Sequence, residues 1–246
     1  MPVVMDLSGH SALVTGAGRR LGRAFAEGLA ARGAAIAVHY GGSAAGAEAV
    51  ARAAGRLGRP ALALQADLAD PSQATSLVER AAAGLGGLDI LVNSAAIFEP
   101  GGLLETDLAA WERHLSINLT APFLLSQAFA RHRAGRPGAI VNLLDWRALR
   151  PGADHFAYTV SKAALAAMTK SLAISLAPSI RVNGLALGAI LPPEGEPRDP
   201  EQILERLPAG RWGTVEEAVD ALLFLVGGSD FVTGAILHLD GGRQLA

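Results

Sequence analysis

The chain has 246 residues, of which 50% are hydrophobic and 18% are charged, a composition typical of a globular protein with a substantial core. Its net charge of −2 gives no electrostatic reason to expect nucleic acid or an anionic membrane as a partner. Cysteine is absent, which excludes disulfides, thiol catalysis and thiolate metal sites, and we expect no metal. Because Met1–Leu7 is too short for a signal peptide and no apolar run has membrane-spanning length, we expect a cytoplasmic protein.

Short apolar runs alternate with longer helical patterns along the chain. Strands are predicted over Ala12–Val14, Ala35–His39, Ala61–Gln65, Asp89–Val92, Ala139–Leu143, Arg181–Leu185 and Ile236–Leu239. Helices are predicted over Leu21–Arg32, Ala44–Leu57, Pro71–Ala83, Asp107–Arg133, Phe156–Ala177 and Val215–Val226. Alternation of this kind predicts the α/β class: one Rossmann-type domain over residues 1–246, with a doubly wound parallel sheet of about seven strands and helices on both faces.

The segment Thr15–Gly22 reads TGAGRRLG and lies between the first predicted strand and the first predicted helix. Glycines at such a turn let backbone N–H groups approach a pyrophosphate, and the helix N-terminus adds a favourable partial charge. Arg19 and Arg20 can contact phosphates or a substrate carbonyl; the alternative is a solvated first helical turn. The pattern therefore predicts a dinucleotide site.

The end of the second strand predicts which dinucleotide is preferred. A site for NAD usually places a carboxylate here to bind the ribose 2′-hydroxyl, but no acidic residue lies between Glu27 and Glu48. Arg19 and Ser43 are available instead. We therefore expect the 2′-phosphate of NADP(H) to be preferred.

Tyr158 and Lys162 lie four residues apart, so on a helix they share one face. A nearby ammonium favours the phenolate, so we expect the pKa of Tyr158 to be lowered and its hydroxyl to exchange protons with a substrate. The chain has only two tyrosines and two lysines, which singles out this pair. Chance is the alternative, because Lys170 shows that lysine is tolerated elsewhere.

These motifs resemble those of the short-chain dehydrogenase/reductase family, which usually has a serine thirteen residues before the tyrosine. Asp145 occupies that position here. The resemblance implies the catalytic set Asn118, Asp145, Tyr158 and Lys162. It also implies a cofactor site made of Gly16, Arg19, Arg20, Leu21, His39, Tyr40, Ser43, Asp67, Leu68, Asn93, Ser94, Ala95, Tyr158, Lys162, Gly188 and Ile190.

One branch of that family, the pteridine reductases and bacterial dihydromonapterin or dihydrofolate reductases, resembles the chain more closely. The shared features are Gly16–Gly22, the His39-Tyr40 pair, the aromatic Phe98 and Asp145. The resemblance implies NADPH-dependent reduction of a dihydropterin or dihydrofolate. The substrate would then be bound by Arg20, Phe98, Asp145 and Tyr158.

Two departures from this branch leave alternatives open. Ala96 stands where pteridine reductases commonly have a serine, and Leu187-Gly188 replaces the family's Pro-Gly. The alternatives are a reductase of another carbonyl or imine, such as a 3-oxoacyl compound, and a dinucleotide-binding protein with little turnover. A carboxylate at Asp145 would repel an alkoxide, which favours a nitrogen heterocycle over an ordinary ketone.

Two further expectations concern a loop and the assembly. The segment Gly188–Pro200 carries four prolines and follows a strand, so we expect a substrate loop over about residues 188–210; a solvated connection is the alternative. Family members are usually tetramers, and Asp107–Arg133 and Phe156–Ala177 resemble helices that pack between subunits. We expect a homotetramer, although the sequence does not distinguish it from a dimer.

Overall fold

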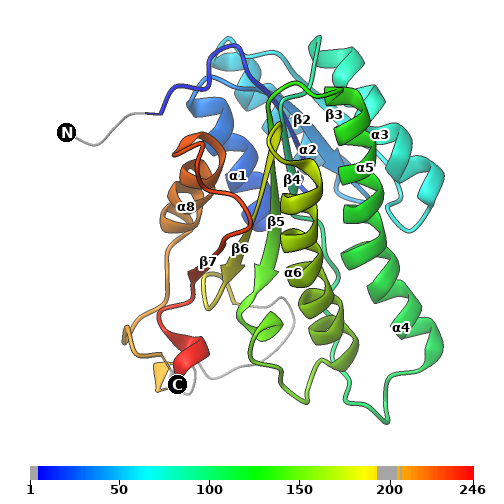
Figure 1. Ribbon diagram of the computed structural model, residues 1–246, viewed down its shortest axis with the longest axis vertical. Helices are drawn as coiled ribbons and strands as arrows, with labels where there is room; N and C mark the ends of the chain where they lie inside the picture. Colours follow the sequence, from blue (N-terminus) through cyan, green and yellow to red (C-terminus); the bar gives the residue numbers. More distant parts are fainter. Residues whose placement is uncertain (1–4, 193–203, 206) are drawn as a thin grey trace.

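In the computed structural model, which describes residues 5–192, 204–205 and 207–246, the strands form one parallel sheet (Figure 1). The order of its seven described strands is β3-β2-β1-β4-β5-β6-β7. The bounds are β1 (Ser11–Val14), β2 (Ala35–Tyr40), β3 (Ala61–Gln65), β4 (Ile90–Asn93), β5 (Gly138–Asp145), β6 (Ile180–Leu187) and β7 (Ile236–Leu239). The predicted single-domain, doubly wound α/β fold is confirmed.

Helices cover both faces of the sheet. On one face lie α1 (Arg20–Ala31), α2 (Ala44–Arg56) and α8 (Val215–Gly227). On the other lie α3 (Pro71–Leu85), α4 (Leu108–Leu115), α5 (Ala121–Arg133) and α6 (Phe156–Leu176). Strand β1 pairs with both β2 and β4, so the chain crosses from one half of the sheet to the other at this point. In such sheets the crevice beyond the carboxyl ends of these strands is the usual place for a ligand.

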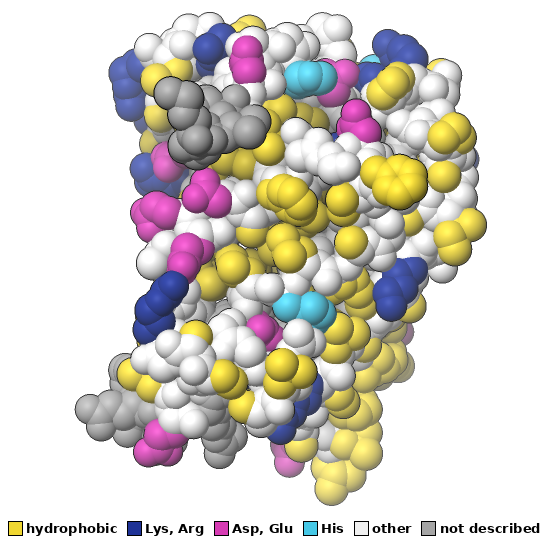
Figure 2. All heavy atoms as spheres, turned by 60° about the vertical axis from the view of Figure 1, so that its left-hand side comes forward, with side chains coloured by type: hydrophobic (Ala, Val, Ile, Leu, Met, Phe, Trp, Pro, Cys, Tyr) yellow, Lys and Arg dark blue, Asp and Glu magenta, His cyan; other side chains and the backbone are white. Residues whose placement is uncertain are grey.

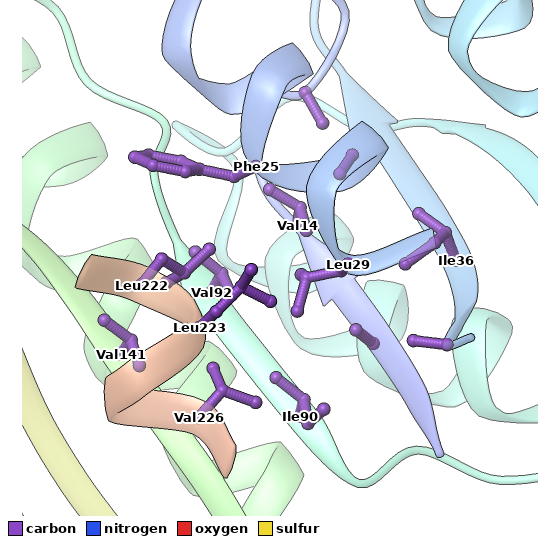
Figure 3. Close-up of a cluster of buried hydrophobic side chains, with 14 of the residues drawn as sticks. Val14, Phe25, Leu29, Ile36, Ile90, Val92, Val141, Leu222, Leu223 and Val226 are labelled. Atoms are coloured by element: carbon purple, nitrogen blue, oxygen red, sulfur yellow. The ribbon is translucent and has the colours of Figure 1, made fainter. Parts of the chain in front are cut away.

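The core explains why the strands are short, continuous apolar runs. Figure 3 shows Phe25 and Leu29 of α1 and Leu222 of α8 packed over Val14 and Val92 of the sheet. A second buried cluster fills the opposite face. Strands covered on both sides need apolar residues at successive positions. Burying one large apolar side chain completely stabilises the folded state by roughly 1.5–3 kcal/mol relative to leaving it exposed. The sheet is thus a firm support for residues at its carboxyl edge.

Strands β5 and β6 run further than predicted. Their parallel pairing continues through Leu144↔Ala186 to Asp145↔Leu187, whereas the apolar pattern predicted ends at Leu143 and Leu185. Backbone pairing extends both strands, because residues 143–145 of β5 pair with β6 and the end of β6 pairs with β7 as far as Leu187↔Leu239. Asp145 is consequently the last residue of a central strand, and its backbone is held by the sheet.

The prediction of one regular helix over Asp107–Arg133 is wrong in the middle. A wider, π-helical turn η1 (Ser116–Thr120) separates α4 from α5 and contains the buried Asn118. Both polar atoms of the Asn118 amide bind the backbone of Ile97, at 2.9 and 3.0 Å. Such π turns are frequent at functional sites because they re-aim a side chain.

The substrate loop predicted over about residues 188–210 is only partly described. From Pro193 to Ile203 the predicted substrate loop lies outside the described residues, as does Arg206.

Among the residues that are described, no helix combines the length and the apolar character needed to cross a bilayer.

Candidate functional site

A cleft of about 970 Å³ opens at the carboxyl ends of β1, β4, β5 and β6, where the strand order reverses. Most of the residues predicted for a site line it. They are Gly16, Arg19, Arg20, Leu21, His39, Ser43, Asp67, Leu68, Ser94, Ala95, Phe98, Asp145, Tyr158, Lys162, Gly188 and Ile190. The described part of the chain thus brings the predicted cofactor, catalytic and substrate residues to one cavity.

The turn after β1 packs closely against the segment after β4. Gly16 has a φ of +65°, and a Cβ there would lie 2.9 Å from the Cα of Ala95. Oγ1 of Thr15 accepts hydrogen bonds from the backbone N–H groups of Ser94 and Ala95, at 2.9 and 3.0 Å. The turn therefore needs glycine for both its conformation and its close approach, and it leaves backbone groups at the N-terminus of α1 facing the cleft.

His39 fixes the same turn from the side of β2. Its Nδ1 accepts a hydrogen bond from the Gly16 N–H at 3.1 Å, and its Nε2 lies 3.1 Å from the carbonyl of Ala66. Burial lowers the pKa of His39, which favours the neutral ring with its proton on Nε2. Although His39 lines the cleft, both ring nitrogens are already engaged in holding β1, β2 and β3 together.

Arg20 has an unusual backbone conformation. Its φ is +51°, in the left-handed region, where a residue other than glycine costs on the order of 1–3 kcal/mol. The side chain is exposed and lines the cleft, and Nη2 donates a 2.7 Å hydrogen bond to the carbonyl of Pro192. An arginine held at a position that suits glycine indicates a use for its side chain.

The end of β2 is open and carries no carboxylate. Gly41, Gly42 and Ser43 line the cleft beside Arg19, and a Cβ added at Gly41 would meet nothing within 4 Å. The acidic residue Asp67, which also lines the cleft, follows the neighbouring strand β3. Hydroxyl, amide and guanidinium donors at a strand end that itself carries no carboxylate suit a phosphate group.

Asp145 and Tyr158 are in contact at the other end of the cleft. The Tyr158 hydroxyl donates to Oδ2 of Asp145 at 3.2 Å, and Oδ1 accepts the backbone N–H of Arg147 at 2.9 Å. Nζ of Lys162 lies 5.8 Å from the centre of the tyrosine ring and donates to the carbonyl of Leu143 at 2.7 Å. Strand β5 and helix α6 thus place a carboxyl, a phenol and an amine side by side.

The expectation of a lowered pKa for Tyr158 is wrong. Burial raises the pKa of its phenol well above 10, and the neighbouring carboxylate of Asp145 adds to the effect. Burial also raises the pKa of Asp145 and lowers the pKa of Lys162 to about 8. The sequence argument considered only the attraction of Lys162, whereas burial of the phenol and the carboxylate of Asp145 set the direction of the pKa shift.

Phe98 belongs to the segment after β4 and packs against the start of α6. Its ring stacks on the buried His155, with centroids 3.9 Å apart and an interplanar angle of 12°. It also meets the Tyr158 ring edge-to-face at 4.6 Å and 85°. One face of the predicted stacking aromatic is therefore already covered by His155, which fixes the orientation of the ring beside Tyr158.

Three predicted site residues do not line the cleft: Asn118, Tyr40 and Asn93. Asn118 donates to Oγ of Ser161 at 3.1 Å, and that hydroxyl donates to the carbonyl of Tyr158 at 2.7 Å. This chain of bonds connects η1 to the backbone of Tyr158. Tyr40 packs on the core beneath α1 and α2, and Asn93 donates to the side chain of Asn142 at 2.8 Å.

Several residues that the sequence did not assign to the site also line the cleft, notably Trp146, Trp212 and Arg243. The guanidinium of Arg243 lies over the Trp146 ring, 4.3 Å from its centre. Trp146 directly follows Asp145, so the sequence allowed it either to narrow the pocket or to be a core residue. No local pattern connects Arg243 with the site, since more than ninety residues separate it from Trp146.

No cluster of three or more histidine, cysteine or acidic side chains suited to a metal occurs in the described ranges.

The fold and the cleft define a Rossmann-type α/β protein, and comparison with known proteins gives the family. A family model described as enoyl-(acyl carrier protein) reductase matches residues 16–244. The cis-4-hydroxycyclohexanecarboxylate dehydrogenase of Sinomonas cyclohexanicum is 41% identical over 238 residues, covering 94% of this chain and 95% of the relative. The L-xylulose reductase of Bos taurus is 36% identical and covers 97% and 98% of the two chains.

Solved structures agree with this result. The FolM alternative dihydrofolate reductase 1 of Brucella canis, complexed with NADP, has a TM-score of 0.92 and 34% identity. The match covers 99% of this chain and 97% of that chain. The protein is therefore an oxidoreductase that belongs to the short-chain dehydrogenase/reductase family.

Proposed function

We propose that the protein is an NADPH-dependent reductase of a pterin-type substrate, a dihydropterin or dihydrofolate. The observation that carries this proposal is the hydrogen bond between Tyr158 and Asp145, in which a carboxyl with a raised pKa stands where the family usually has serine. A pair of this kind suits protonation of a ring nitrogen. The FolM dihydrofolate reductase of Brucella canis, which has the same fold, gives the proposal further support.

The residues of the cleft fit NADPH. The glycine-containing turn and the N-terminus of α1 suit a pyrophosphate, since backbone donors and a partial positive charge face the cleft. Arg19 and Ser43 would hold the 2′-phosphate, and Asp67 and Leu68 would border the adenine. Bound NADPH supplies a hydride to the substrate.

The proton would come from the chain itself. Reduction of a C=N bond needs a proton on nitrogen as well as hydride on carbon. Because burial raises the pKa of Asp145, its carboxyl retains a proton to higher pH than an exposed one does. The hydrogen bond from Tyr158 to Asp145 couples the two groups: Tyr158 would give its hydroxyl proton to the substrate nitrogen, and a protonated Asp145 would then supply the proton that restores the phenol.

Lys162 would have an electrostatic and positioning role. Its ammonium is buried beneath Tyr158 and is tied to the Leu143 carbonyl, so it holds a positive charge near the phenol as the proton leaves. Asn118 would act through Ser161, whose bond to the Tyr158 carbonyl fixes the first turns of α6. Asn118 is thus a positioning residue in this proposal.

The substrate ring would bind between the nicotinamide and the aromatic side of the cleft. Phe98 borders this space beside Tyr158, and Arg20 can donate to ring oxygen or nitrogen from the opposite rim. Ala96 lines the cleft but offers no hydroxyl, so one hydrogen bond common in pteridine reductases must be absent or made by another group.

A second candidate function is reduction of another carbonyl compound, or oxidation of the corresponding alcohol. The observation in its favour is the 41% identity to a dehydrogenase of cis-4-hydroxycyclohexanecarboxylate, a cyclic alcohol that carries a carboxylate. The sign of the charge at Asp145 counts against it, because an ionised carboxyl repels a developing alkoxide. A non-catalytic dinucleotide-binding protein is less consistent with the intact contacts of Tyr158 and Lys162.

One assay separates these functions. NADPH oxidation is followed with dihydrobiopterin, dihydrofolate, a small 3-oxoacyl ester and 4-oxocyclohexanecarboxylate. Turnover of the pterin compounds is the expected result. If only the ester or the cyclic ketone is reduced, the pterin proposal fails, and if no compound is reduced while NADPH binds, the protein is a binding protein.

We also propose a cytoplasmic homotetramer. Apolar side chains are exposed on the helices that cover the sheet, including Ile174 on α6, at 81%, and Phe224 on α8, at 48%. Figure 2 shows the side of α8 and β7, where apolar side chains are visible across the middle of the face. Burying them between subunits would be favourable. Light scattering of the purified protein tests this proposal: a mass of four chains supports it and a mass of one or two rejects it.

A further inference from the structure

We propose that the ion pair between Arg147 and Asp154 positions the proton-donating residues Asp145 and Tyr158 relative to each other. The inference rests on the proposed reductase function of the same cleft. It adds two residues that act through others rather than on the substrate, and neither of them belongs to the residues predicted for the site from the sequence.

Arg147 is a buried arginine whose charge is paired within the protein. Its side chain is only 6% exposed, whereas that of Asp154 is 52% exposed. Nη1 donates to Oδ1 of Asp154 and Nη2 donates to Oδ2 at 2.9 Å, so the two groups meet through two parallel hydrogen bonds. The guanidinium also lies over the Trp146 ring, 5.0 Å from its centre. A paired contact of this kind fixes both the distance and the orientation of the two chain segments that carry it.

A glycine makes room for the ion pair. A Cβ at Gly152 would collide with Nη1 of Arg147 and lie 3.0 Å from Oδ1 of Asp154. The φ of Gly152 is not positive, so the backbone conformation does not itself call for glycine. The requirement for glycine at this position therefore comes from the ion pair.

On one side the ion pair is connected to the carboxyl of Asp145. This residue ends β5, and its Oδ1 accepts the backbone N–H of Arg147 at 2.9 Å, in the helical turn η2 (Trp146–Ala148). Its Oδ2 accepts the hydroxyl of Tyr158. Because Arg147 and Tyr158 bind the two oxygens of one carboxyl group, a displacement of η2 would turn that group away from the hydroxyl.

On the other side the ion pair is connected to the start of α6. Asp154 lies two residues before this helix, and Tyr158 lies in its first turn. The carbonyl of Asp154 accepts the N–H of Gly101 at 3.0 Å, which holds this part of the chain against the segment after β4. Phe98 of that segment stacks on His155. The ion pair thus joins the end of β5 to the support of both the phenol and the aromatic wall of the cleft.

The charge of Arg147 also acts on both proton-donating groups. Burial raises the pKa of Asp145, and the backbone N–H and the charge of Arg147 oppose this rise, as does the charge of Lys162 on α6. Burial and the carboxylate of Asp145 raise the pKa of Tyr158, and the charge of Arg147 again opposes the rise. Although burial opposes it, the hydrogen bonds and charge of Arg147 lower the pKa of Asp154 to about 2. The ion pair therefore persists at every pH of an enzyme assay.

The variants separate the ion pair from the cation alone. Asp154→Asn breaks the pair and keeps Arg147, Arg147→Met removes the cation, and the double variant removes both charges. The matched control is Asp89→Asn, which breaks a second pair between a buried arginine and a carboxylate, to Arg133 at 2.7 Å. Asp89 directly precedes β4, at the amino edge of the sheet, whereas the cleft lies at the carboxyl edge.

Turnover is measured with NADPH and dihydrobiopterin, or with 4-oxocyclohexanecarboxylate if the pterin is not reduced. Asp154→Asn and Arg147→Met should each lower kcat about tenfold or more, because a displacement of about 1 Å can cost on the order of 10² in rate. The double variant should lose no more than the more damaged single variant, as for residues that act as one unit. The Kd for NADPH in every variant, and kcat in Asp89→Asn, should change less than about twofold, the range for independent sites.

A second measurement does not depend on turnover. The chain has only two tyrosines, so protein labelled with ¹³C at the phenol carbon of tyrosine gives two NMR signals. The signal of Tyr158, assigned from Tyr158→Phe, should shift in Asp154→Asn because its hydrogen bond to Asp145 is altered. The signal of Tyr40 should stay in place, and so should both signals in Asp89→Asn.

Several results would overturn the proposal. An unchanged kcat or an unchanged Tyr158 signal in Asp154→Asn would show that the pair does not position the two groups. A loss confined to Arg147→Met would assign the effect to the cation, and losses that multiply in the double variant would show that the residues act separately. An equal loss in Asp89→Asn would assign the effect to general destabilisation.

Failure of the proposed function is distinguishable from failure of this inference. If the carbonyl compound is reduced and the pterin is not, the proposed substrate is wrong, and kcat with the carbonyl compound tests the ion pair. If neither compound is reduced, the reductase function fails and the Tyr158 signal in Asp154→Asn decides whether the pair positions the phenol. Asp154→Asn and its control also decide the question if Arg147→Met does not fold.

Discussion

The hydroxyl of Tyr158 donates to Oδ2 of Asp145 at 3.2 Å, joining the first turns of α6 to the last residue of β5. This contact reverses the electrostatics that the sequence suggested, because the tyrosine faces a carboxylate and its pKa is raised rather than lowered. The two residues therefore form one proton-holding unit.

Replacing Asp145 by serine should reduce turnover of a pterin substrate and leave NADPH affinity largely intact. Removal of one general acid typically costs on the order of 10²–10⁴ in rate. The change keeps a hydrogen-bond acceptor at the position that the family usually fills with serine, so the fold should be preserved. Steady-state kinetics and NADPH titration measure the two effects.

Tyr158→Phe is the matched comparison for that variant. It should abolish most turnover with every substrate, whereas Asp145→Ser should retain or gain activity toward a simple ketone, because the carboxylate that repels an alkoxide is gone. Unchanged pterin turnover in Asp145→Ser would remove this carboxyl from the mechanism.

The rate should fall on the alkaline side of the pH profile. The pKa of Lys162 is lowered to about 8 by burial, and its charge is lost as the pH rises through that value. The carboxylate of Asp145 opposes this shift, so Asp145→Asn should move the alkaline limb of kcat/KM to lower pH. A limb that stays in place, or moves upward, would show that Lys162 does not control it.

Replacing Lys162 by methionine should stabilise the protein while it abolishes activity. The folded-state pKa lies below the ordinary value of 10.5, so the unfolded chain binds the proton more tightly between about pH 8 and 10.5. The buried ammonium therefore lowers the free energy of unfolding at pH 7, and it does so less as the pH rises through this window. Methionine should raise that free energy by about 1–3 kcal/mol, after loss of the bond to Leu143 is counted.

The measurement for this variant is urea unfolding at pH 7 and at pH 10. The difference between Lys162→Met and the wild type should shrink at the higher pH. Lys170→Met serves as the control, since Lys170 is exposed on the same helix and should show neither effect. A destabilised Lys162→Met protein at pH 7 would mean that the bonding of the ammonium outweighs its burial.

Introducing a carboxylate after β2 should change the cofactor preference. A side chain at Gly41 meets nothing within 4 Å and its φ is not positive, so Gly41→Asp fits without strain. The new charge would repel a 2′-phosphate and accept the 2′-hydroxyl of NADH. We expect the NADPH/NADH ratio of kcat/KM to fall about tenfold or more, as for one strong charged contact. Gly41→Ala is the neutral control, and an equal fall in that variant would assign the effect to shape instead.

The sequence predicted the layout of the fold because strands buried on both faces must be apolar and because turns carry glycine. It placed both ends of Ala61–Gln65 and Ile236–Leu239 correctly. It did not find the last residues of β5 and β6, since Asp145 is polar and is held in the strand by pairing with Leu187. The π turn at Asn118 was also missed, because it depends on a contact with Ile97 that is remote in sequence.

In the candidate site too, features set by local sequence were predicted and features set by remote contacts were not. Local motifs identified Gly16, Tyr158 and Lys162, whose spacing is fixed by a turn or by one helix. The contacts that set their chemistry are not local: His155 covers Phe98, and Arg243 reaches Trp146 from the end of the chain. The direction of the Tyr158 pKa depended on burial, which spacing alone does not give.

The loss of stability caused by placing a functional side chain at a strained backbone position can be measured at Arg20. Its φ of +51° is strained for arginine but not for glycine, so Arg20→Gly should leave the free energy of unfolding unchanged or raise it by up to about 1 kcal/mol, even though the bond to Pro192 is lost. Arg19 has an extended backbone with φ −155°, so the matched variant Arg19→Gly should instead lower that free energy by roughly 0.5–1 kcal/mol.

Binding of NADPH and substrate should be weakened by Arg20→Gly, although the stability of the protein is not. If Arg20 contacts the pyrophosphate and the substrate ring, Arg20→Gly should weaken NADPH binding and raise the KM for dihydropterin, each by about tenfold, the scale of a lost charged hydrogen bond. Urea unfolding and NADPH fluorescence titration measure the two effects on one preparation. A protein that gains no stability relative to Arg19→Gly would show that the backbone at Arg20 is not strained. Full retention of affinity would show that the arginine is only a solvated part of the first turn of α1.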